Sequence, residues 1–269
     1  MKAMVLAAGL GTRLHPLTDD RPKALVEVGG RTMLEITLAR LRGVGIRDVI
    51  VNAHHFADKL IEYLRANHNF GMSIDVSRED VLLDTGGGLK KAAYFFADTN
   101  EPFLLHNVDV ISDIDFAQMV QHHREQSALA TLAAQERASS RQLLFDAQGR
   151  LCGRRTRGVA EDEIVRGATD ARSSAEVDDS ARKTHLGKSS RSGARMPLAF
   201  SGIHVISPEI FARMTETGVF SIITTYLRLA AEDAKIMGFR ADEYYWRDLG
   251  KPESIRQAEE DLRSDLLRL

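Results

Sequence analysis

The sequence is poor in cysteine and carries almost no net charge. Cys152 is the only cysteine among 269 residues, which excludes an internal disulfide framework and a zinc site built from several cysteines. We expect Cys152 to be an inert thiol and the chain to be cytoplasmic. The formal charge of −2 gives no overall attraction to nucleic acid or to an anionic membrane. An anionic partner must therefore be met by a local arrangement of cations.

Long apolar runs and several familiar motifs are also missing. The run "AMVLAAG" near the start is too short, and too soon interrupted by glycine, for a signal peptide or a membrane span. Leu14 occupies the position where a dinucleotide fingerprint needs its third glycine, and no Walker loop is present. Ser139 and Ser140 lie outside any G-x-S-x-G elbow. We therefore expect no membrane or nucleic-acid partner and no serine nucleophile.

Strand-like and helical patterns alternate in the first half of the chain. Apolar runs typical of buried strands are "KAMVLAAG", "RDVIVNA", "GMSIDVSRE" and "PFLLHNVDV". Between them come helical patterns in "TMLEITLARLRGVG", in "HFADKLIEYLRAN" and, after a "DTGGG" loop, near residues 89–96. This alternation predicts an α/β fold with a doubly wound, mostly parallel sheet and helices on both faces. A ligand would bind at the carboxyl ends of the strands.

The second half is less regular. Strands are expected in "ALATLAAQE", twice in "RQLLFDAQGRLCG", and in "PLAFSGIHVIS" and "AKIMGFRA", with helices after Pro208, in "SIITTYLRLAAED" and from 252 to about 267. Residues 154–196 have few large apolar side chains and no periodicity. Such a segment buries too little surface to offset its ordering entropy. We expect one domain over residues 1–269 with a flexible insertion at 154–196; a basic flap over an anionic substrate is the less favoured interpretation.

A glycine-rich stretch after the first strand carries the strongest chemical signal. In "LAAGLGTRLHPLTDDRPKAL", Gly9 and Gly11 allow backbone N–H groups to approach phosphate oxygens. The guanidinium of Arg13 can chelate those oxygens. Pro22 stiffens the chain before Lys23, which can return a second cation to the same crevice. The stretch predicts a phosphate-binding loop.

This stretch resembles the signature L-A-A-G-x-G-T-R-L-x-P-L-T…P-K-x-L of the sugar-1-phosphate nucleotidyltransferases, also called nucleoside-diphosphate-sugar pyrophosphorylases. The further motifs "LDTGGGL", "FSGIHV" and "WRDLG" make the layout most similar to short N-acetylmuramate-1-phosphate uridylyltransferase-like members. The resemblance covers the chain except about 135–198. It implies a Rossmann-like nucleotidyltransferase fold. The implied reaction is attack of a sugar 1-phosphate oxygen on the α-phosphorus of a nucleoside triphosphate, with UTP the expected donor and pyrophosphate the leaving group.

The resemblance also assigns catalytic and metal-binding residues. Arg13 would clamp the leaving β- and γ-phosphates, and Lys23 would neutralise the α-phosphate and the incoming sugar phosphate. Asp109 and Asp248 would bind Mg2+, a hard cation that prefers carboxylate oxygens. The family usually has N-G-D or Y-G-D before the first aspartate, whereas Val108 replaces the glycine here. A valine there could crowd the nucleotide or reject a positive φ. The resemblance to relatives that lack an added acyltransferase domain also implies that the protein is a monomer or a small homo-oligomer.

The residues expected to bind nucleotide and sugar fall into three groups. The nucleoside and phosphates would contact Ala7, Ala8, Gly9, Gly11 and Thr12; the base would contact Thr85, Gly86 and Gly87; the sugar would contact Asn107, Ser201 and Gly202. Glu79 is a weaker candidate near the base, and the three consecutive glycines at 86–88 could instead form a flexible turn.

Other chemistry-bearing residues are better explained by structure. The adjacent side chains of His54 and His55 point apart, and no third metal ligand has the right spacing. His106 in an apolar strand is expected to be a core histidine. The "YYW" at 244–246 could stack on a nucleotide, but strand alternation places at least one of the three rings in the core.

Two alternatives stay open beside sugar nucleotide synthesis. The same fold supports transfer from CTP to a phosphocholine-type acceptor. A catalytically silent regulatory or scaffold relative that binds a nucleotide sugar is the other, suggested by Val108 and by the insertion.

Overall fold

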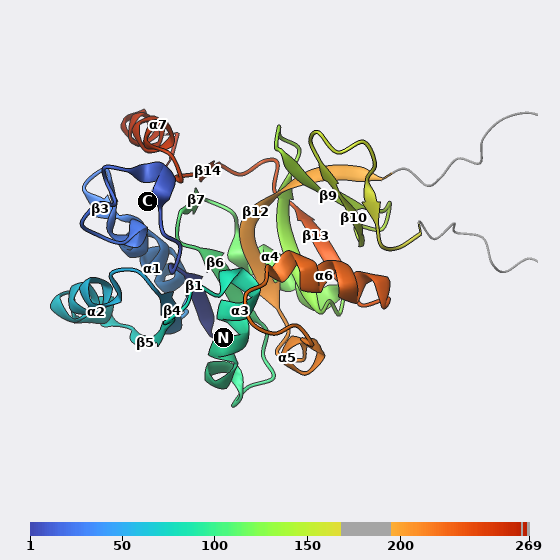
Figure 1. Cartoon of the computed structure of the whole chain (residues 1–269), viewed down its shortest axis with the longest axis horizontal. Helices are drawn as coiled ribbons and strands as arrows, with labels where there is room; N and C mark the ends of the chain where they lie inside the picture. Colours follow the sequence, from blue (N-terminus) through green and yellow to red (C-terminus); the bar gives the residue numbers. More distant parts are fainter. Residues whose placement is uncertain (168–194, 265, 268–269) are drawn as a thin grey trace, which may run out of the picture.

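The computed structural model describes residues 1–167, 195–264 and 266–267. A large mixed sheet runs through the molecule in the order β11-β10-β9-β12-β6-β1-β4-β5, and β8 and β13 attach beside β12 (Figure 1). The expected α/β fold is confirmed. None of the helices in the described part of the chain has the length and apolar character needed to cross a membrane.

The amino-terminal half supplies four parallel strands. They are β1 (Ala3–Leu6), β4 (Asp48–Ala53), β5 (Ser73–Arg78) and β6 (Phe103–Asn107), with β1 in the middle between β4 and β6. Side chains along β1 alternate between two apolar clusters: Ala3 and Val5 belong to one, Met4 and Leu6 to the other. Because strand side chains point alternately to opposite faces, the sheet is buried on both sides.

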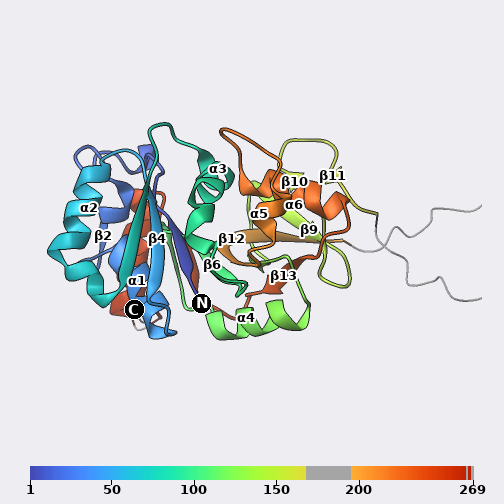
Figure 2. The ribbon, with the colours of Figure 1, turned by 90° about the horizontal axis from the view of Figure 1, so that it is seen from below.

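Helices cover both faces, as the sequence predicts. The cluster containing Val5 includes residues of α1 (Met33–Gly43), α2 (Ala57–Ala66), α4 (Phe116–Glu125) and α7 (Pro252–Arg263). The cluster containing Met4 includes residues of α3 (Asp84–Lys91), α5 (Ile210–Arg213) and α6 (Ile222–Ala231). Figure 2 shows α4 on one side of the sheet and α5 and α6 on the other. Short 3-10 helices are η1 (Thr12–Leu14), η2 (Lys23–Leu25), η3 (His68–Gly71) and η4 (Ala92–Phe96).

The second half adds one reversed strand and a small antiparallel lobe. The long strand β12 (Met196–Ile206) runs antiparallel to β6 and β8 (Ala130–Gln135), and β13 (Ile236–Arg240) is parallel to β8. The first residues of β12 pair instead with β9 (Arg141–Phe145). β9 and β10 (Leu151–Thr156), the two strands expected in this stretch, form a hairpin, and the two-residue β11 (Glu163–Ile164) completes the lobe. Two small ladders, β2 (Glu27–Val28) with β3 (Arg31–Thr32) and β7 (Val110–Ser112) with β14 (Trp246–Asp248), lie outside the main sheet.

Two boundaries differ from the sequence-based expectations. Part of the segment expected to be a flexible insertion, residues 154–196, lies in strands, because β10 extends to Thr156 and β11 pairs with it; residues 168–194 of that segment lie outside the described residues. The "DTGGG" loop is the start of α3. Glycine has a low helix propensity, but the close packing of this helix against residues 218–220 requires glycine. A Cβ on Gly86 would lie 2.4 Å from the Phe220 ring, and one on Gly87 would lie 2.5 Å from the Gly218 carbonyl oxygen.

Candidate active site

The phosphate-loop residues and the first aspartate meet directly. The chain leaves β1, turns at Gly11 in the left-handed region (φ 68°), and reaches Lys23 at the start of η2. Lys23 Nζ donates to Asp109 Oδ2 at 2.8 Å, and both side chains are about 15% exposed. A Cβ on Gly9 would lie 3.0 Å from Lys23 Nζ, so glycine at this position lets the ammonium lie against the loop backbone.

A two-stranded ladder brings the second aspartate beside the first. β14 pairs antiparallel with β7, with Asp248 opposite Val110. The amide of Leu249 donates to the carbonyl of Asp109 at 2.8 Å. Because these are main-chain contacts, they fix the backbone next to both carboxylates.

Arg13 lies close to Asp248 because residue 250 is a glycine. A Cβ on Gly250 would lie 2.5 Å from Arg13 Nη2 and 2.8 Å from Asp248 Oδ1. The Gly250 amide also donates to Asp248 Oδ1 at 2.7 Å. The structure therefore brings all four residues expected to carry the chemistry, Arg13, Lys23, Asp109 and Asp248, into one cluster.

A cavity of about 330 Å³ adjoins this cluster at the carboxyl ends of β1, β4 and β6. Several residues expected to bind nucleotide or phosphate line it. Its wall consists of Leu6, Ala8, Gly9, Lys23, Asn52, Leu82, Asp84, Thr85, Asn107, Asp109 and Val219. The site therefore lies where open α/β sheets bind their ligands.

Sequence reasoning missed a buried brace beneath the loop. Asn52, at the end of β4, accepts hydrogen bonds from the amides of Ala7 at 2.6 Å and Ala8 at 3.3 Å. Its Nδ2 donates to Glu79 Oε1 at 2.7 Å, and Glu79 Oε2 accepts the Leu83 amide at 2.9 Å. Glu79 is only 2% exposed, so its carboxylate holds the loop backbone through Asn52. The available signal was an asparagine that ends an apolar strand.

The proposed base-binding residues have structural partners of their own. Thr85 lines the cavity, while its Oγ1 accepts the Ile222 amide at 3.0 Å at the start of α6. The amides of Gly86 and Gly87 both donate to the Phe220 carbonyl. These amides are thus already engaged within the protein in this structure, and a base contact by Thr85 stays a prediction.

The residues expected on the sugar side lie close together between β6 and β12. Gly202 has a φ of 75°, and a Cβ there would lie 2.9 Å from Asn107 Nδ2. Asn107 Oδ1 and the hydroxyl of the fully buried Ser201 have no hydrogen-bond partner among the described residues. Unpaired buried polar atoms are uncommon in native proteins.

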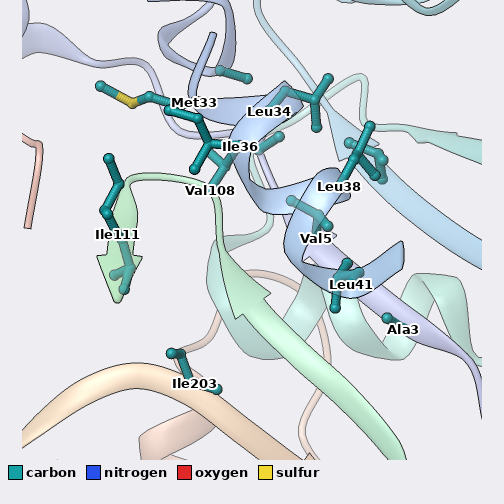
Figure 3. Close-up of a cluster of buried hydrophobic side chains, with 14 of the residues drawn as sticks. Ala3, Val5, Met33, Leu34, Ile36, Leu38, Leu41, Val108, Ile111 and Ile203 are labelled. Atoms are coloured by element: carbon teal, nitrogen blue, oxygen red, sulfur yellow. The ribbon is translucent and has the colours of Figure 1, made fainter. Parts of the chain in front are cut away.

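Val108 does not obstruct the crevice. Its side chain is fully buried and belongs to the same apolar cluster as Ile36 and Met33 of α1, as Figure 3 shows. Its amide donates to the Leu6 carbonyl at 3.1 Å, and its φ is not positive. The expected backbone strain is therefore wrong, and the side chain packs in the core rather than lying exposed at the site.

His106 lies in the core, as expected, and His54 has a structural hydrogen-bond partner. His54 bonds to the Glu79 carbonyl, and burial lowers the pKa of His106 to about 4, which keeps that ring neutral. Across the described ranges, no group of three or more His, Cys, Asp or Glu side chains could hold a metal ion. A metal at Asp109 and Asp248 would therefore need further oxygens from a phosphorylated substrate, which is the usual arrangement for Mg2+.

Comparisons with known proteins agree with this geometry. The profile of the family described as "Nucleotidyl transferase" matches residues 2–142. The N-acetylmuramate alpha-1-phosphate uridylyltransferase of Caulobacter vibrioides is 35% identical over 263 residues, which cover 96% of this chain and 95% of that protein. The UTP–glucose-1-phosphate uridylyltransferase of a Synechocystis species is 35% identical over 49% of this chain and 36% of its own length.

Solved structures share the fold at low identity. A protein from Bacillus anthracis described as a glucose-1-phosphate thymidylyltransferase superposes with a TM-score of 0.74 at 17% identity, covering 100% of this chain and 97% of that one. HddC from Yersinia pseudotuberculosis, complexed with GMP-PN, gives a TM-score of 0.70 at 20% identity, covering 97% and 99%. The family profile and the full-length relative together show that this chain belongs to the sugar-1-phosphate nucleotidyltransferase family of enzymes.

Proposed function

We propose that this enzyme transfers a uridylyl group from UTP to a sugar 1-phosphate, in the presence of Mg2+, and releases pyrophosphate. The observation that carries the proposal is the cluster formed by Arg13, the Lys23–Asp109 pair and Asp248 beside the loop that follows β1. Two anionic substrates must approach each other in this reaction, so catalysis consists mainly of positioning and charge neutralisation.

Lys23 would neutralise the reacting phosphates. Its ammonium lies against Gly9 and beside Asp109, at the wall of the cavity. Arg13 lies farther along the loop, beside Gly250, where its planar guanidinium would hold the leaving pyrophosphate with two parallel hydrogen bonds. No protein nucleophile is required, and the cluster supplies two cations, Arg13 and Lys23, beside the carboxylates of Asp109 and Asp248.

The donor set at the crevice suits Mg2+. Asp109 and Asp248 would hold the ion with carboxylate oxygens, and the substrate phosphates would complete its shell. When bound, the ion would supply Lewis-acid neutralisation of phosphate oxygens. Gly250 supports this assignment because any side chain there would meet both Asp248 and Arg13.

UTP is favoured by the relative that matches nearly the whole chain, which is a uridylyltransferase. Relatives that match only half of the chain include mannose-1-phosphate guanyltransferases, for example from Yarrowia lipolytica at 36% identity over 50% of this chain. The experiment below also tests the two alternatives, transfer from CTP and a catalytically silent role in binding a nucleotide sugar.

The test measures pyrophosphate release with each nucleoside triphosphate, a panel of sugar 1-phosphates and Mg2+. We expect UTP to give the highest kcat/KM and chelation of Mg2+ to abolish turnover. Replacing Lys23 by Met should lower kcat/KM at least about 100-fold, since a charge that contacts the reacting phosphates is removed. Lys235→Met is the matched control: it removes an exposed lysine whose ammonium, within the part of the chain that the structure describes, bonds only to the Gln126 carbonyl. Full turnover in the Lys23 variant, or folded wild-type protein inactive across the panel, would contradict the proposal.

A further inference from the structure

An arginine stands directly before the second candidate metal ligand but points away from it. Strand side chains alternate between two sides, so Arg247 and Asp248 project in opposite directions from β14. The contacts agree with this alternation. Trp246 donates its indole N–H to the Ser201 carbonyl on β12 at 2.7 Å, whereas Arg247 reaches α7. Arg247 is therefore not a third cation for the substrate phosphates.

A buried carboxylate on α7 receives Arg247. Asp261 Oδ2 accepts hydrogen bonds from Arg247 Nη2 and from the Tyr245 hydroxyl, both at 2.6 Å. Its Oδ1 accepts Gln257 Nε2 at 3.2 Å, and Arg247 Nε donates to the Tyr245 hydroxyl oxygen at 2.8 Å. Asp261 is only 6% exposed. A carboxylate buried to this extent needs hydrogen bonds and an opposite charge to compensate for its lost hydration, and this network supplies both.

The strand that carries Asp248 needs such support. β14 has three residues and pairs with β7 in a two-stranded ladder. Two-stranded ribbons twist more than larger sheets and are marginally stable alone. The main-chain hydrogen bonds set how far Asp248 lies along the ladder, but they leave β14 able to rotate about it. Asp261 opposes that rotation, because it holds two side chains on one side of the strand.

The helix that carries Asp261 is itself fixed to the segment after Lys23. α7 lies beside β14 (Figure 1), and its Ile255 and Ala258 are buried in the same apolar cluster as Val28 of β2. The Gly29 amide donates to Glu259 Oε1 at 3.3 Å. α7 is thus a firm support, and the position that it gives Asp261 is passed on to β14.

We propose that Asp261 is a positioning residue of the metal site: by holding Arg247 and Tyr245 on α7, it directs Asp248 toward the metal ion and the substrate phosphates. The proposal rests on the proposed function, since it concerns the ion that Asp109 and Asp248 would hold. Asp261 lies behind the strand and acts through it. Its loss should therefore weaken the use of Mg2+ in particular, which a role in folding alone would not do.

The experiment measures how much Mg2+ the enzyme requires. Pyrophosphate release from UTP and a sugar 1-phosphate is followed against Mg2+ concentration in wild type and in Asp261→Asn, far below the unfolding temperature of each. Asn keeps the size of the side chain but removes the charge that holds Arg247. We expect the half-saturating Mg2+ concentration to rise about 10-fold, with kcat at saturating Mg2+ within about threefold of wild type, because partners behind metal ligands affect metal affinity by about this much.

Binding of Mn2+ gives a second readout that needs no turnover. Mn2+ prefers the same carboxylate and phosphate oxygens as Mg2+, and its binding to protein changes the relaxation of water protons. With UTP present, and with a mixture of Mn2+ and UTP as the blank, Asp261→Asn should bind Mn2+ about 10-fold more weakly than wild type.

Arg247→Gln tests the same contact from its other end, and it carries the test if Asp261→Asn does not fold. It should also raise the Mg2+ requirement. In the double variant two neutral amides face each other and can form a hydrogen bond, so it should need no more Mg2+ than either single variant. Glu253→Gln is the matched control, because it removes a carboxylate from an exposed ion pair with Arg256 on the same helix and should leave the Mg2+ requirement unchanged.

An unchanged Mg2+ requirement in the folded variants would overturn the proposal even if their stability falls, because Asp261 would then only attach the helix. An equal shift in Glu253→Gln, or effects that multiply in the double variant, would overturn it too. If wild type releases no pyrophosphate with any acceptor, the proposed function fails, and Mn2+ binding alone decides this inference. Weaker Mn2+ binding by Asp261→Asn supports it, while equal binding, or no binding by wild type, refutes it.

Discussion

The brace formed by Asn52 and Glu79 makes a quantitative prediction about stability. Asn52 uses its oxygen for two loop amides and its nitrogen for Glu79, while Glu79 uses both oxygens as acceptors. Asn52→Asp places two carboxylate oxygens in contact where a 2.7 Å hydrogen bond existed. Glu79→Gln replaces one acceptor by a donor, so one amide must face another amide. Each change leaves a buried polar group unsatisfied, and we expect each to lower the free energy of unfolding by about 2–4 kcal/mol.

The combined exchange should restore the network. With both substitutions, the introduced amide at 79 donates to the introduced carboxylate at 52, which still accepts the amides of Ala7 and Ala8. Every donor again has an acceptor, so the double variant should be within about 1 kcal/mol of wild type. The coupling energy is then about 3–8 kcal/mol, far above the roughly 0.5 kcal/mol within which independent sites add.

Urea unfolding of wild type, both single variants and the double variant measures this coupling. Because the brace holds the loop amides, kcat/KM should fall in the single variants and recover in the double variant. A surface control is Gln121→Glu, which alters an exposed amide–carboxylate pair one helical turn apart on α4 and should cost less than about 0.5 kcal/mol. If the two single effects simply add in the double variant, the brace does not operate as described.

Two further predictions concern the crevice and the core. Gly250→Ala should lower kcat/KM at least about 10-fold without a matching loss of stability, because the added Cβ would displace Arg13. Steady-state kinetics measures this effect. The control is Gly43→Ala, which has open space around the added Cβ and should only stabilise α1, by about 0.5–1 kcal/mol. Burial lowers the pKa of His106 to about 4 and of His204 to about 3, so the unfolded chain binds protons that the folded protein does not. The free energy of unfolding should therefore fall from about pH 6.5 toward pH 4, by up to about 1.4 kcal/mol per pH unit for each ring, and a flat profile in urea titrations would contradict this.

The sequence predicted the strands and helices of the first half because each is a local pattern. Apolar runs and helical periodicity depend on neighbouring residues alone, and "AMVL" and "DVIVNA" lie in the expected strands. The reversal of β12 was not predictable in this way, since its direction depends on pairing with β6 and β8 far along the chain. The three glycines of α3 were assigned to a loop for the same reason: contact with Phe220 overrides their low helix propensity.

In the candidate site, too, the features set by neighbouring residues were predictable and those set by distant contacts were not. Arg13 and Lys23 were visible because the loop motif is contiguous, whereas the contacts of Asn52 span 45 residues to Ala7 and 27 residues to Glu79. Val108 illustrates the converse error. A valine in place of a glycine suggested a strained backbone, but only the structure gives its φ and shows its side chain in the core.

The β7–β14 ladder has an evolutionary consequence. The main chain itself sets the spacing of Asp109 and Asp248, because Asp248 pairs with Val110 and Leu249 bonds to Asp109. The long stretch of polypeptide between the two carboxylates can therefore gain or lose residues in its loops while their geometry is preserved. Descendants of this chain could change the small antiparallel lobe of β9, β10 and β11 and still inherit the same arrangement of Asp109 and Asp248.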